Sequence, residues 1–70
     1  MKEDVPKLQS YLRKVFRNDA IRVAMHGRKT DMAEVFIDKE QIAQLYRDEE
    51  DGEITYQLQM AILDIDLEDV

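Results

Sequence analysis

The stretch "RDEEDGEITY", Arg47 to Tyr56, places five acidic residues around one glycine and raises the question of a calcium site. An EF-hand loop has oxygen ligands at positions 1, 3 and 5, glycine at position 6 and a bidentate glutamate at position 12. With Gly52 at position 6, positions 1 and 12 fall on Arg47 and Leu58. A cation and an apolar side chain replace two essential ligands, so we expect no metal site. The residues Glu50-Asp51-Gly52 instead predict a hairpin turn, because glycine adopts positive φ without steric cost.

Residues that could carry catalysis are few. His26 is the only histidine, and the surrounding "AMHGRK" supplies no partner for metal binding or proton transfer. The chain has no cysteine, and turns explain both glycines, so neither a thiol nucleophile nor a phosphate-binding loop is expected. We therefore expect a protein that is not an enzyme and uses no cofactor. Acidic pairs such as Asp64 and Asp66 leave an enzymatic alternative open, in which carboxylates gather in the folded chain.

The charges are divided between the two parts of the chain. Residues 1–30 carry eight basic and three acidic residues, whereas residues 31–70 carry two basic and thirteen acidic residues. Phosphate groups could bind a patch in the first part, which consists of Arg13, Lys14, Arg17, Arg28 and Lys29. A nucleic-acid-binding accessory protein that uses this basic helix is our alternative function. The net charge of -6 and the absence of an aromatic RNA-binding motif make a nucleic-acid partner the weaker hypothesis.

One amphipathic helix is predicted at the start of the chain, from Asp4 to Arg17. Its apolar residues recur three and four positions apart, as on one face of a helix: Val5, Leu8, Tyr11, Leu12, Val15 and Phe16. Glu3, Asp4 and Pro6 suit its first turn. The 70-residue chain is therefore expected to form a single small domain, in which this helix packs on a sheet.

Four strands are predicted after the helix, at about 20–26, 32–37, 41–47 and 54–62, in an α+β fold with an antiparallel meander. Alternation of apolar and polar residues is clearest in "EITYQLQMAI". The side chains expected beneath the helix are Ile21, Val23, Met25, Val35, Ile37, Ile54, Tyr56, Leu58 and Met60.

The segment 38–51 also permits a different structure. Asp38 and Gln41 resemble a helix capping box, and Ile42, Leu45 and Tyr46 have helical spacing. The rival fold therefore has a second helix at 39–51 and a three-stranded sheet.

The block "RDEEDGEITYQLQMAILDIDLED", together with "YLRKVFRN" and "AEVFID", resembles a family of small uncharacterised alphaproteobacterial proteins, a domain of unknown function. Its most specific part is "DEEDG" followed by "QMAIL". The resemblance implies a strand for "QIAQLYRD", because relatives carry glycine and valine at the positions of Ala43 and Gln44. It implies no activity.

More apolar residues are present than one helix and one sheet face need. The surplus includes a candidate protein interface, formed by Phe36, Tyr46, Leu63, Ile65 and Leu67. Its last three members lie in an acidic and apolar tail, residues 63–70, for which a bend, a short helix or a flexible segment is expected. We predict an interaction module that binds a protein partner or a second copy of itself. No apolar run is long enough for a membrane span, and we expect a cytoplasmic location.

Overall fold

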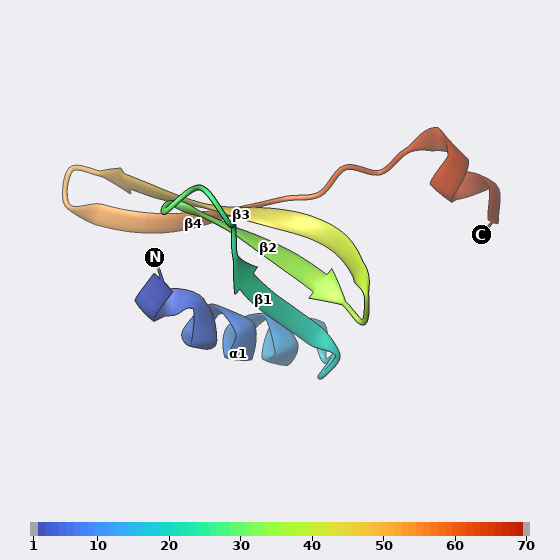
Figure 1. Ribbon diagram of the computed structural model, residues 1–70, viewed down its shortest axis with the longest axis horizontal. Coiled ribbons are helices and arrows are strands. Elements are labelled where there is room, and N and C mark those ends of the chain that lie inside the picture. The colour runs from blue at the N-terminus through green and yellow to red at the C-terminus, as the bar shows by residue number, and fades with distance from the viewer. Residues whose placement is uncertain (1, 70) are drawn as a thin grey trace.

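The computed structural model describes residues 2–69 and shows one helix packed on one antiparallel sheet (Figure 1). The helix α1 (Val5–Phe16) follows a short 3-10 helix, η1 (Lys2–Asp4). The strands are β1 (Ile21–Met25), β2 (Met32–Ile37), β3 (Glu40–Glu50) and β4 (Glu53–Gln59), and a second 3-10 helix, η2 (Asp64–Asp69), follows them. The strands are ordered β1-β2-β3-β4, and each pairs antiparallel with the next. The predicted α+β fold with a four-stranded meander is confirmed, and the rival second helix is wrong.

Two tight turns join the last three strands. At the β2–β3 turn, Asp38 has φ 56°, and at the β3–β4 turn, Asp51 and Gly52 have φ values of 53° and 83°. Two consecutive residues of positive φ match the twist of a two-residue hairpin, and aspartate and glycine tolerate this conformation. The hairpin predicted at Gly52 is thus present. Asp38 begins a turn and does not cap a helix.

A bulge in β3 explains why its sequence resembles a helix. Val35 of β2 pairs with Ala43, but the next residue, Phe36, pairs with Gln41, which leaves Ile42 without an opposite residue. An extra residue of this kind changes the alternation of faces within a strand. Ile42 consequently packs beside the same core as the buried Ala43 and Leu45. The three-residue spacing from Ile42 to Leu45 imitates one face of a helix.

The hydrophobic core lies between α1 and the first three strands. Among the described residues, it contains a cluster of seven buried side chains, namely Leu12, Ile21, Val23, Ala33, Val35, Ala43 and Leu45, and Val5, Leu8 and Tyr56 are among the residues packed partly against them. Ala33 and Ala43 are small and almost fully buried, so α1 can lie close to the middle of the sheet. Most of the core is therefore supplied by β1, β2 and the first half of the bulged strand β3.

Side chains of α1 also hold the outer edge of β1. The Gln9 Oε1 atom accepts a hydrogen bond of 3.0 Å from the backbone N–H of Val23. The Arg13 Nε–H donates a hydrogen bond of 2.7 Å to the backbone carbonyl of Ile21. These two bonds satisfy edge groups that an open strand would present to solvent, and they fix the helix on the β1 side.

Three residues predicted in the core are largely exposed. Ile54 is 48% exposed, Leu58 41% and Met60 58%. The reason is the width of the helix: α1 is about 10 Å across, whereas the outer strands of a four-stranded sheet lie about 14 Å apart. A helix held at β1 cannot also cover β4. In addition, β4 ends at Gln59, so the predicted extension of this strand to residue 62 is wrong.

Candidate functional site

An apolar groove runs between α1 and β4, and we call it the α1–β4 groove. It is lined from the helix by Tyr11, Val15 and Phe16 and from the strand side by Ile54, Leu58 and Met60. Each of these side chains is between 41% and 63% exposed. The groove therefore continues the apolar face of the sheet beyond the part that α1 covers.

The groove consists of two hollows that meet at Leu12, Phe16 and Leu58. The hollow that borders Tyr11, Val15 and Ile54 has a volume of about 530 Å³. The second, beside the end of α1, has a volume of about 300 Å³. Concave apolar surfaces of this size accept side chains of a binding partner.

The rim of the groove is basic on its helix side. Lys7 and Lys14 lie four residues before and three residues after Tyr11, so they flank this side chain on the surface of α1. Both lysines are exposed. The β3–β4 hairpin is instead acidic, and Asp48, Glu50, Asp51 and Glu53 line a polar hollow on the sheet face opposite the groove. The groove thus has a basic rim along the helix.

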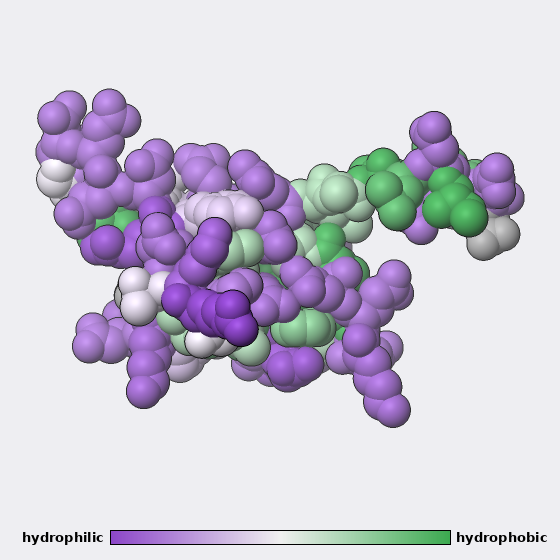
Figure 2. All heavy atoms as spheres, turned by 45° about the horizontal axis from the view of Figure 1, so that its top comes forward, coloured by the Kyte–Doolittle hydropathy of each residue, from purple (hydrophilic) through white to green (hydrophobic). Residues whose placement is uncertain are grey.

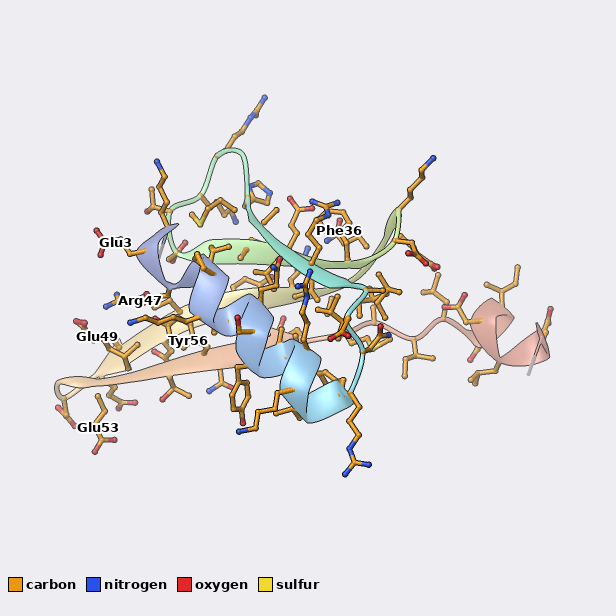
Figure 3. All side chains as sticks on the ribbon, turned by 90° about the horizontal axis from the view of Figure 1, so that it is seen from below. Glu3, Phe36, Arg47, Glu49, Glu53 and Tyr56 are labelled. Atoms are coloured by element: carbon orange, nitrogen blue, oxygen red, sulfur yellow. The ribbon has the colours of Figure 1, made fainter. Side chains whose placement is uncertain are left out.

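A polar contact closes the groove at the start of α1. The Tyr56 hydroxyl donates a hydrogen bond of 2.5 Å to Asp4 Oδ2, and Arg47 Nη2 forms an ion pair of 3.2 Å with Glu49 Oε2. Figure 3 shows Arg47, Glu49 and Tyr56 together near the beginning of the helix. The hydrogen bond to Asp4, followed by burial and the negative charge of Asp4, raises the pKa of Tyr56, and Arg47 offsets part of this rise.

The predicted interface residues lie in two separate places. Phe36 and Tyr46 are half-buried on the sheet face opposite α1. There the Arg22 guanidinium lies 4.4 Å from the centre of the Phe36 ring, and the Tyr46 hydroxyl donates to Gln44 Oε1 at 2.7 Å. Hydrophilic residues cover most of the face seen in Figure 2. Leu63, Ile65 and Leu67 lie instead in the segment after β4 and are 58–65% exposed.

The predicted anion-binding patch is divided in the same way. Lys14 and Arg17 lie at the end of α1, whereas Arg28 and Lys29 lie in the loop after β1. The five residues of β1 separate the two groups by about 16 Å. Arg13 is already engaged with the carbonyl of Ile21. Nucleic-acid binding stays a prediction, and it would have to use one of the two groups.

His26 belongs to the backbone structure of the β1–β2 loop. Its Nδ1 atom accepts a hydrogen bond of 3.1 Å from the backbone N–H of Arg28. Among residues 2–69, no three histidine or acidic side chains are grouped so that they could hold a metal ion. The same residues contain no helix that is both long enough and apolar enough to cross a membrane.

Sequence reasoning missed the α1–β4 groove because it assigned the residues of the groove to the core. The periodicity of the apolar positions on α1 and β4 shows only that they share a face. A comparison of helix width with sheet width would have shown that one helix leaves a strand uncovered. The difference between these two widths was the signal that could have predicted the groove.

Comparison with known proteins shows a family relationship. Residues 4–66 match the family model described as "Protein of unknown function (DUF3126)". The search of curated proteins and the search of solved structures gave no match.

Proposed function

The chain belongs to the DUF3126 family of proteins of unknown function, and from its geometry we propose that it is a non-enzymatic protein-interaction module. Its binding surface is the α1–β4 groove. One observation carries the proposal: six large apolar or aromatic side chains line a single groove and remain about half exposed. A contiguous apolar surface of this kind is typical of a protein interface.

The chemistry of the groove favours a protein as its partner. Tyr11 and Phe16 offer aromatic surface at the helix side, and aromatic residues are frequent anchors of binding energy in protein interfaces. The lysines border the apolar centre of the groove on its helix side, and a polar rim beside an apolar centre is usual in a protein interface. At the start of α1, the Asp4–Tyr56 hydrogen bond holds the two walls at a fixed separation. A partner can therefore bind to a largely preformed surface.

A photo-crosslinking amino acid placed at Leu58 tests the proposal in cells that produce the full chain. The matched control carries it at Gln57, the neighbouring residue of β4, whose side chain points to the opposite face. We expect discrete crosslinked protein adducts from position 58 and none from position 57. The absence of a discrete adduct from position 58, or equal adducts from both positions, would show that the groove is not a protein-binding surface.

The cytoplasmic location, the alphaproteobacterial origin and the diagnostic value of "DEEDG" and "QMAIL" stay predictions from the sequence. The groove is formed by the side chains that α1 leaves uncovered, whatever the location or origin of the protein.

A further inference from the structure

The segment Met60–Asp69, which we call the arm, leaves the sheet at the end of β4 and projects away from the body of the protein (Figure 1). Ile62, Leu63, Ile65 and Leu67 are each 58–65% exposed. Acidic residues stand between and after them, at Asp64, Asp66 and Glu68. Figure 2 shows hydrophobic residues along the arm, outside the body, with hydrophilic residues among them. The arm is thus a second apolar surface that its own chain leaves uncovered.

The arm does not turn back toward the groove of its own chain. It continues beyond β4 as an extended segment before η2 begins at Asp64. Reversal would need a tight turn within residues 60–63, but "MAIL" contains none of the glycine, proline, asparagine or aspartate residues that favour one. The direction of the arm therefore favours contact with another molecule.

We propose that the arm of one copy binds in the α1–β4 groove of a second copy, and that the exchange is reciprocal in a homodimer. This inference rests on the proposed function, because it names the partner of the same groove. Exchange of one segment between two identical chains is an economical way to form a dimer, since each contact is made twice.

The apolar and charged residues of the arm complement those of the groove. Leu63 and Leu67 can fill the hollows beside Tyr11, Phe16 and Leu58, which are lined mainly by apolar side chains. The acidic residues of the arm then lie near Lys7 and Lys14 on the helix rim. An apolar arm with acidic flanks fits this groove better than a basic or uncharged one, because opposite charges at the rim select the partner.

The length of the arm is sufficient for the exchange. The four extended residues of the arm and the six residues of η2 together reach about 25 Å, whereas the seven residues of β4 span about 23 Å. The arm is therefore about as long as β4 and can lie along the groove of the partner.

Light scattering after size-exclusion chromatography tests the dimer with the full chain at micromolar concentration. We expect twice the chain mass of 8.3 kDa. The arm variant Leu63→Glu with Leu67→Glu and the groove variant Tyr11→Glu with Val15→Glu should each give monomers, with a dissociation constant raised by about 100-fold or more. The matched control Gln57→Glu with Gln59→Glu adds the same charges to the opposite face and should stay dimeric. All four positions of the first two variants are exposed, and circular dichroism verifies their folding.

Mixing the two defective variants distinguishes arm exchange from other dimers. The arm variant keeps an intact groove, and the groove variant keeps an intact arm, so the mixture should regain a dimer held by one intact contact. A similar mixture of Lys7→Glu with Lys14→Glu and Asp64→Lys with Asp66→Lys should form a heterodimer through reversed charges.

Three outcomes would overturn arm exchange: a wild-type monomer, a dimer that both variants retain, or variants that do not recover on mixing. The crosslinking experiment keeps this failure separate from that of the proposed function. An adduct between position 58 and a different protein would support the interaction module but exclude a second copy of the chain as its partner. The absence of any adduct would exclude both the interaction module and arm exchange.

Discussion

The β3–β4 corner depends on the backbone conformation of single residues. Gly52 has φ 83°, and a Cβ atom added there would meet no atom within 4 Å. A substitution at Gly52 is therefore disfavoured by backbone strain and not by crowding. We expect Gly52→Ala to lower the free energy of unfolding by about 1 kcal/mol, because L-residues rarely adopt this conformation.

Gly27 provides the matched control for this prediction. A Cβ atom added at Gly27 would also meet no atom within 4 Å, but this glycine has no positive φ. We expect Gly27→Ala to change stability by no more than about 0.5 kcal/mol, or to raise it slightly through the unfolded state. Urea unfolding followed by circular dichroism measures both variants. Equal effects at Gly52 and Gly27 would contradict the strain at the corner.

Tyr56 couples the stability of the fold to alkaline pH. Its hydrogen bond to Asp4 raises its pKa in the folded protein above the usual tyrosine value. A group with a raised folded pKa contributes stability that is complete below its unfolded pKa, about 10, and is lost as the pH rises through the folded value. We expect the melting temperature to fall more steeply above about pH 10 in the wild type than in Tyr56→Phe.

Thermal unfolding of the wild type, Tyr56→Phe and Asp4→Asn between neutral and strongly alkaline pH checks this expectation. Asp4→Asn keeps an oxygen acceptor but removes the charge, so it should show an intermediate alkaline loss. Identical alkaline profiles for the wild type and Tyr56→Phe would exclude the Asp4–Tyr56 contact as a source of stability.

At the scale of elements, periodicity and strand propensity predicted the helix and three of the strands, and the resemblance favoured the strand at 41–47. Neither gave the exact ends of the elements or the set of buried residues. Alternation in "EITYQLQMAI" identified β4 correctly, yet it could not show that β4 lies beyond the reach of α1. The segment 38–51 stayed ambiguous because the bulge at Ile42 imitates helical spacing. These outcomes depend on contacts between elements, which a local sequence pattern does not contain.

Because α1 covers only part of the sheet, shortening an apolar side chain in β1 should lower the free energy of unfolding more than the same change in β4. Ile21 is 2% exposed in the core, whereas Ile54 is 48% exposed in the groove. Ile21→Ala should destabilise the fold by about 2–5 kcal/mol, because it leaves a cavity that the core cannot fill. Ile54→Ala should cost less than about 1 kcal/mol in dilute solution. Chemical denaturation of both variants checks this difference, and similar costs would mean that α1 also covers β4.

At the scale of the whole molecule, the candidate site was predicted only in part. The sequence alone indicates that Leu63, Ile65 and Leu67 are surplus to the core, and they are exposed on the arm. Phe36 and Tyr46 instead lie on the opposite face, where polar neighbours contact them. A sequence pattern does not reveal the groove, because the groove depends on where α1 lies on the sheet. The bonds from Gln9 and Arg13 to β1 fix that position of α1.

Removal of those two bonds should change how the protein behaves at high concentration. We expect Gln9→Ala with Arg13→Ala to release the outer edge of β1 and to form thioflavin-positive aggregates on long incubation. The control variant is Lys7→Ala with Lys14→Ala, which changes two exposed residues of α1. It leaves the bonds from Gln9 and Arg13 to β1 in place and should form no such aggregates. Equal behaviour of the two variants would show that the helix does not protect this edge.

The bonds at β1 also limit growth of the sheet itself. A fibril grows by strand addition only if each copy that joins still has an unpaired edge strand to which the next copy can bind. Here the helix blocks one edge of the described sheet, and only β4 is left open. A sheet that grew by pairing of two β4 edges would have only helix-covered β1 edges at its ends, so strand addition would stop at two copies.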